Sequence, residues 1–130
     1  MSGELAGARS TVAVALRAAG VASPEPGDPL VVPGALVRGG TPWLAPSRVG
    51  PRGTRACRLN VLLLAGAPDT TAALVILEEL AERAVLATSD LAGWSTPTLT
   101  SARVVEVFGT LYLGAELELE TILTIADPAP

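Results

Sequence analysis

The chain has 130 residues, a hydrophobic content of 49%, only 3% aromatic residues and a net charge of −4, and arginine is its sole basic residue. This length favours one domain, whose core forms without metal ions or disulfides and is built mainly from leucine, valine, isoleucine and alanine. Because the chain contains no histidine, a Ser-His-Asp or Cys-His catalytic pair is excluded, and we expect a protein that is not an enzyme.

Charge is distributed unevenly along the sequence. Residues 1–60 hold seven arginines against three acids, a balance of +4, whereas residues 61–130 hold two arginines against ten acids, a balance of −8. Such asymmetry is typical of nucleic-acid contact or of a self-complementary oligomer. Since the chain as a whole is acidic, the pattern favours the oligomer.

The single cysteine, Cys57, excludes an internal disulfide and favours the cytosol as the compartment. No apolar run approaches the roughly 20 residues of a membrane span. Glu4 and Arg17 argue against a signal peptide in the N-terminal apolar stretch. We therefore expect no membrane partner.

The N-terminal third predicts one helix followed by an irregular segment. Apolar residues at helical spacing predict a helix over about Gly3–Ala19 that ends at Gly20. The segment 23–54 is rich in proline and glycine. Within it, Ser23–Pro33 is predicted to be an extended linker, because proline removes amide donors and fixes φ.

Two strands are predicted next. The first covers Ala35–Arg38, bends at Gly39–Gly40 and resumes near Trp43. The loop Ser47–Thr54 leads to a second strand over Arg55–Ala65. The second strand becomes apolar on both sides toward its C-terminal end, which indicates that it runs into the centre of a sheet.

The C-terminal half predicts a long helix and a strand pair. The helix spans about Thr70–Thr88, and the inward stripe that its spacing predicts comprises Leu74, Leu77, Ala81, Ala84, Val85 and Thr88. The strands Ala102–Thr110 and Tyr112–Ile125 form a hairpin or a strongly bent pair, because glycines at 109 and 114 bracket the join. The predicted fold is a single α+β domain over residues 1–130, with a mostly antiparallel four-stranded sheet packed on one face by two helices.

The last predicted strand carries a row of acids. In the stretch AELELETILTI (115–125), Glu116, Glu118 and Glu120 point to one face while the apolar residues point to the other. Alternate residues on a strand lie ~6.5–7 Å apart, too far for neighbouring carboxylates to share one small metal ion comfortably. Two interpretations stay open: a solvated sheet face, and a docking stripe for the arginines of a neighbouring subunit. No metal or cofactor is expected.

The opposite charge gathers in the segment that contains Arg48, Arg52, Arg55 and Arg58. Basic loops that contain glycine can hold phosphates, but no aromatic residue is interleaved to stack bases. Contact with a neighbour's acids, contact with DNA and a merely solvated loop all remain possible. The flanking arginines could lower the thiol pKa of Cys57, although a small buried hydrophobe is the favoured interpretation of this residue.

Three segments carry a resemblance to a known family: RLNVLLLAG (58–66), TTAALVILEELAERAVLAT (70–88) and RVVEVFGTLYLGAELELETI (103–122). In their order and pattern they resemble the tail terminator and tail-completion (head–tail joining) proteins of long-tailed bacteriophages. In that family the final strand often begins with an aromatic residue, then small residues, then alternating apolar ones, as the chain does from Tyr112. The likeness covers most of the chain as pattern and length, without a sharp motif.

The resemblance implies a structural virion protein, assembled in the host cytoplasm, that forms a homo-oligomeric ring, expected to be a hexamer. Such a ring caps the tail tube and contacts the tail tube protein on one side and a head–tail connector or stopper on the other, with DNA in its channel. Another neck component, or a cellular α+β ligand-binding or regulatory domain, stays open as an alternative. The proline- and glycine-rich region departs from the family pattern and leaves open whether the arginine loop faces DNA or a neighbouring subunit.

Overall fold

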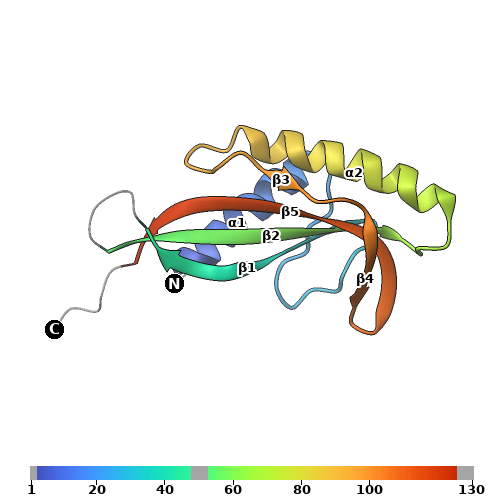
Figure 1. The fold of residues 1–130 in the computed structure, drawn as a ribbon, viewed down its shortest axis with the longest axis horizontal. Coiled ribbons are helices and arrows are strands. Elements are labelled where there is room, and N and C mark those ends of the chain that lie inside the picture. The colour runs from blue at the N-terminus through green and yellow to red at the C-terminus, as the bar shows by residue number, and fades with distance from the viewer. Residues whose placement is uncertain (1–2, 48–52, 126–130) are drawn as a thin grey trace.

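A computed structural model describes residues 3–47 and 53–125 of the chain. It confirms the α+β class: two helices pack on a mostly antiparallel sheet (Figure 1). The elements follow one another as α1 (Glu4–Ala18), β1 (Gly34–Pro46), β2 (Thr54–Gly66), α2 (Thr71–Ser89), β3 (Thr98–Leu99), β4 (Arg103–Val107) and β5 (Thr110–Thr124).

The sheet has five strands and not the four that the sequence predicted. Its order is β1-β2-β5-β3, with β4 paired to the N-terminal part of β5. The additional strand, β3, has two residues and pairs antiparallel with Glu118 and Leu117 of β5. It lies in a polar, proline-containing stretch without alternation, and its extended form depends on pairing with β5 and not on its own sequence.

The first strand is continuous through the predicted bend. β1 pairs with β2 on both sides of an irregularity between Gly39 and Leu44. A Cβ atom at Gly40 would lie 2.8 Å from Cβ of Arg58, so glycine permits the close approach of β1 to β2 at this point. The predicted bend is therefore a bulge inside one long strand.

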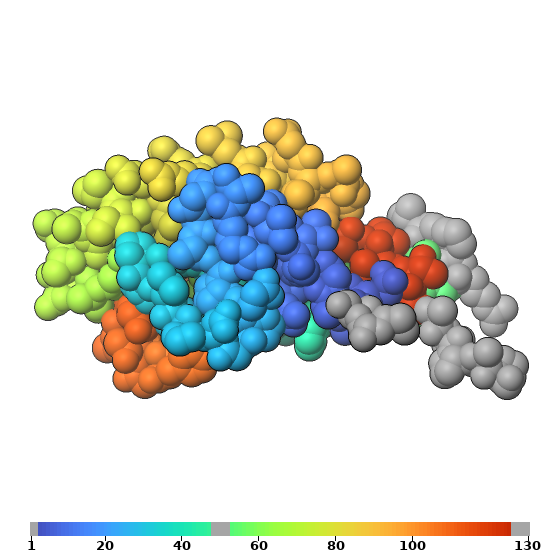
Figure 2. All heavy atoms as spheres, turned by 180° about the vertical axis from the view of Figure 1, so that it is seen from behind, coloured from blue at the N-terminus to red at the C-terminus, as the bar shows by residue number. Residues whose placement is uncertain are grey.

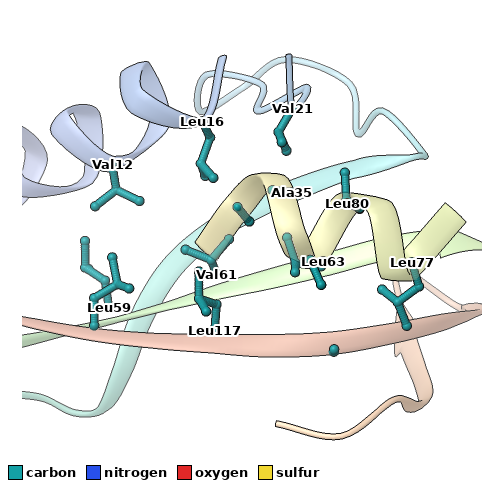
Figure 3. Packing of buried hydrophobic residues seen from close by; sticks show 14 of the residues in the cluster. Val12, Leu16, Val21, Ala35, Leu59, Val61, Leu63, Leu77, Leu80 and Leu117 are labelled. Atoms are coloured by element: carbon teal, nitrogen blue, oxygen red, sulfur yellow. The ribbon is translucent and has the colours of Figure 1, made fainter. Parts of the chain in front are cut away.

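The main core lies between the helices and one face of the sheet. Val12 and Leu16 of α1 face Leu59, Val61 and Leu63 of β2, and all five are at most 1% exposed (Figure 3). Figure 3 also shows Leu77 of α2 pointing toward β5, with Leu80 on the side of α2 nearer Val21 and Leu117 of β5 below Val61. The alternation of β2 places its odd-numbered residues, from Cys57 onward, in this core as predicted.

The predicted inward stripe of α2 needs one correction. Leu77, Ala81, Ala84 and Thr88 are buried as expected, but Leu74 is 47% exposed. Leu80 and Ala73 are buried instead, so the face that contacts the sheet is rotated about the helix axis relative to the predicted stripe. The helix has apolar residues on more than one side, and the spacing alone did not distinguish which side packs inward.

The second face of the sheet is only partly open to solvent. The linker 23–33 has no regular structure, as predicted, but Leu30 and Val32 pack against Leu62 and Leu64 of β2. Residues of the β4–β5 hairpin complete this second, smaller cluster: Val105, Val107 and Tyr112. The linker is therefore part of the packing. In Figure 2, seen from behind, the linker (light blue) lies beside α1 and above the hairpin (orange).

Candidate functional site

The open half of the second sheet face carries the charged side chains. Register pairs Arg58 with Glu120 and Asn60 with Glu118 across β2 and β5, and it pairs Arg38 of β1 with Asn60. These residues share the face opposite the helices because alternate strand residues point to the same side. The structure thus brings the predicted acidic row together with basic residues of the same protomer.

Glu116 is neutralised inside its own chain. Its Oε1 accepts hydrogen bonds from Nη2 of Arg38, at 3.0 Å, and from Arg103. Its Oε2 accepts a hydrogen bond of 3.2 Å from Nδ2 of Asn60, which is 8% exposed. The side chain of Glu116 is only 14% exposed. The geometry gives this carboxylate a structural role in joining β1, β2, β4 and β5.

The carboxylates of Glu120 and Glu118 have fewer partners within the protomer than that of Glu116. Nε of Arg58 lies 3.9 Å from Oε2 of Glu120, and both side chains are about half exposed. Glu118 is exposed, and its side chain makes no hydrogen bond or ion pair with any other residue in the described ranges. The acidic row therefore contains one satisfied carboxylate, one weakly paired carboxylate and one without a counter-ion among those residues.

A groove of about 320 Å³ surrounds these two outer carboxylates. Its walls include Glu118, Glu120 and Arg58, with Thr41 of β1 on one side. The opposite wall is the segment that leads into β3, which contributes three hydroxyl side chains: Ser95, Thr96 and Thr98. Two carboxylates against one guanidinium make the groove electronegative, and the hydroxyls supply further hydrogen-bonding atoms.

Backbone hydrogen bonds hold the hydroxyl wall in place along β5. The amide of Ser95 donates to the carbonyl of Glu120 at 2.7 Å, and its hydroxyl accepts from the amide of Glu120 at 2.9 Å. Thr100 makes the same reciprocal pair with Glu116. The sequence prediction missed this wall, because a serine- and threonine-rich stretch reads as a loop.

Of the predicted arginines, the two that the structure describes do not lie together. Arg55 and Arg58 are three positions apart on β2 and therefore lie on opposite faces of the sheet. Nη1 of Arg55 donates to the carbonyl of Thr54 at 3.0 Å, and Arg58 borders the groove. Arg48 and Arg52 lie outside the described residues.

Cys57 is confirmed as a buried residue of the main core. It has no exposed surface, and burial raises the pKa of its thiol, with the charge of Glu120 adding to the effect. This is the opposite of the lowered pKa that flanking arginines could have produced. A protonated, enclosed thiol is a poor nucleophile.

Within residues 3–47 and 53–125, no group of three or more Cys, Asp or Glu side chains is arranged to hold a metal ion. None of the helices described is long and apolar enough to cross a membrane. Comparison with protein-family models finds no match, and comparison with curated protein sequences finds none either. The groove and its unpaired glutamate are thus the features from which a function is argued.

Proposed function

We propose that this chain is a structural subunit of a bacteriophage tail, a tail terminator that forms a homo-oligomeric ring at the junction of tail and head. The observation that carries the proposal is the electronegative groove in which Glu118 has no counter-ion within the described residues. The order of elements that underlies the family resemblance is consistent with this role. The ring is expected to be a hexamer, with DNA in its channel.

The groove supports contact with an arginine of a second copy. A guanidinium presents donors in a planar fork that matches a carboxylate, and the hydroxyls of the groove wall can accept its remaining N–H groups. The arginine-containing segment, which includes Arg55 at the far end of β2, is the complementary surface. A basic segment that enters an acidic groove is a contact between two different patches, and such contacts build rings when the rotation closes.

The partners of the three glutamates within the protomer favour one of them for the proposed contact. Glu116 already has three partners in its own protomer and offers little to a neighbour. Glu120 shares Arg58, so a second guanidinium there would compete with an existing pair. Glu118 is therefore the acid that we assign to the contact between subunits.

Charge reversal tests the proposal. Sedimentation velocity of the unchanged protein at low ionic strength is expected to show assemblies of about six subunits, and negative-stain images are expected to show rings with a central channel. Glu118→Arg should shift the protein toward monomers, whereas Asp90→Arg, at an exposed position at the end of α2, should not. Combining Glu118→Arg with Arg55→Glu should restore part of the assembly.

The alternative functions predict different outcomes. A groove of this volume is also large enough for a small ligand. A protein that stays monomeric at every concentration and ionic strength would contradict the ring and favour a ligand-binding domain. Rings that do not bind the ends of purified tail tubes would indicate another neck component, such as a stopper or connector.

A further inference from the structure

A second groove lies on the other side of β3, and it is apolar. Val85 and Leu86 of α2 and Leu99 of β3 line it, and so do Glu78 and Glu82 of α2. Its volume is about 520 Å³. Leu86 is 74% exposed, which is unusual for a leucine in a helix that packs on a sheet. Water covers an apolar hollow that is large enough to receive a side chain.

Further apolar residues are exposed on α2. Leu74 and Val75 are both exposed and lie about three turns before Leu86. Helical spacing places them on the same side of α2 as the residues that line the groove. The exposed side of α2 therefore carries apolar residues near both ends, Leu74 and Val75 at one and the groove at the other, with exposed acids between them: Glu78, Glu79 and Glu82.

The β4–β5 hairpin carries the second unexplained apolar surface. Phe108, at its turn, is 85% exposed and has a φ of +51°, a backbone conformation that favours glycine or asparagine. Val104 and Leu111 are also exposed, on one face of the hairpin. Phe108 borders a pocket that it shares with α1 and the linker of its own protomer, yet most of its surface is exposed. An exposed aromatic residue in a conformation it disfavours is the kind of outlier from which a binding role is inferred.

The hairpin cannot fill the groove of its own protomer. Phe108 adjoins the start of β5, whereas Leu99 pairs with Leu117, seven residues further along that strand. At ~3.3 Å per residue this separation is on the order of 20 Å. Figure 1 shows the hairpin at one end of the molecule, with β3 nearer the middle, beside α2. Only a second molecule can bring the two surfaces together.

We propose that Phe108 of one copy of this chain inserts into the α2–β3 groove of the next copy. The inference rests on the self-assembly proposed above and identifies the apolar contact within it. Four exposed apolar residues lie on the acceptor side, on α2 and β3: Leu74, Val75, Leu86 and Leu99. Three lie on the donor hairpin: Val104, Phe108 and Leu111.

The exposed apolar area of these residues is comparable to the apolar area that a specific protein–protein interface buries. Together the seven side chains expose on the order of 700 Å², about the apolar share of an interface of roughly 1,200 Å², the lower end of the range for specific complexes. The apolar groove and the electronegative groove lie on either side of β3, since Leu99 borders the first and Thr98 borders the second. One neighbour that binds at this edge can therefore contact both.

The contact joins two different surfaces, so each protomer has one donor hairpin and one acceptor groove. Cysteine cross-linking tests this arrangement. Protein carrying Phe108→Cys is mixed with protein carrying Leu86→Cys under mild oxidation, and a disulfide-linked dimer containing one copy of each is expected within minutes. Each variant alone should cross-link at least tenfold less. The native Cys57 has no exposed surface and does not compete.

Val14→Cys is the matched control, because Val14 is an exposed valine on α1 that lies outside both surfaces. If it cross-links to Phe108→Cys as readily as Leu86→Cys does, random collision explains the product and the proposal fails. Efficient cross-linking of Phe108→Cys with itself would mean that hairpins meet each other, and this would also overturn the proposal.

A second variant preserves the turn. Phe108→Asn suits the positive φ and keeps the hairpin, and it is expected to weaken self-association at least tenfold in sedimentation equilibrium. If the unchanged protein assembles but the cross-link is absent and Phe108→Asn assembles normally, this contact is wrong and the ring stands. If the unchanged protein never assembles, both proposals fail.

Discussion

At the scale of single residues, Glu116 and Glu118 show how position decides what a carboxylate does. They lie two residues apart on β5 and point to the same face. Glu116 binds two arginines and a buried asparagine of its own chain, whereas Glu118 is exposed. The first is expected to contribute to folding and the second to contacts outside the protomer.

Replacing each glutamate by alanine separates these roles. Glu116→Ala leaves the amide of Asn60 buried without its acceptor, so we expect a loss of roughly 1–3 kcal/mol in the free energy of unfolding. The half-exposed arginines add little, because water and salt screen such pairs. Glu118→Ala should change stability by less than about 0.5 kcal/mol. Urea unfolding of both variants measures the difference, and equal losses would contradict it.

Cys57 makes a prediction about alkaline pH. Its raised pKa means that the folded protein keeps the thiol proton over a pH range in which the unfolded chain has lost it. The resulting contribution to stability is complete below the unfolded pKa of about 8.5 and is lost as pH rises through the folded pKa.

We therefore expect the free energy of unfolding to fall as the pH rises above about 8.5, by up to ~1.4 kcal/mol per pH unit. Cys57→Ala should remove this fall, although it lowers stability at neutral pH by leaving a cavity. Unfolding curves at several pH values measure both effects. A fall of the same size in the variant would assign it to other groups.

At the scale of elements, glycine decides where the strands bend. A Cβ atom at Gly114 would lie 2.7 Å from the carbonyl oxygen of Leu63 and 2.9 Å from Cγ2 of Val105. This glycine therefore lets β5 turn the hairpin onto the second face of the sheet. Gly7, in contrast, lies within α1 and has open space around its Cα.

Alanine substitutions at these two glycines should have opposite signs. Gly114→Ala forces strands apart, and we expect a loss of about 1–3 kcal/mol. Gly7→Ala removes the entropic cost of glycine in a helix and should add about 0.5–1 kcal/mol. Thermal unfolding of the two variants gives the test, and a stabilising Gly114→Ala would show that the strand can relax at no cost.

The turn at Phe108 couples stability to association. A non-glycine residue in the left-handed backbone conformation is destabilised by roughly 1–2 kcal/mol, and asparagine is among the residues that tolerate this conformation best. Phe108→Asn should therefore stabilise the protomer while it weakens self-association. Unfolding at a concentration too low for assembly measures the first effect, and a destabilised protomer would show that Phe108 contributes to its own fold.

Much at this scale was predictable. The helix boundaries, the central position of β2 and the hairpin all follow from apolar spacing and glycine placement. The orientation of α2 did not, because Leu74 and Leu80 are equally apolar and only the packing distinguishes them. The partners of Glu116 were also missed, since Arg38 and Arg103 come from strands 78 and 13 residues away in sequence.

At the scale of the whole molecule, charge and apolar surface meet along one edge strand. β3 separates an electronegative groove from an apolar one. The acids and bases that are separated along the sequence are only partly separated in the fold, since Arg58 lies beside Glu120. The groove at Glu118 retains a negative charge that is not neutralised among the described residues, and this charge can contact a second copy.

This arrangement predicts how salt affects assembly. Raising NaCl from about 0.05 M to about 0.5 M shortens the screening length to ~4 Å and should weaken self-association without abolishing it, because the apolar contact is not screened. Glu118→Gln should assemble less at low salt and respond less to added salt. Sedimentation equilibrium across the salt series measures both, and an unchanged salt response in Glu118→Gln would remove Glu118 from the contact.

The two hydrophobic clusters on opposite faces of β2 protect this strand from local unfolding. From Val61 to Leu64 the strand is covered by helices on one side and by the linker and hairpin on the other, and it has a neighbouring strand at each edge. No local fraying reaches these amides. In deuterium exchange they should be the slowest in the chain, with protection that reports the global free energy of unfolding.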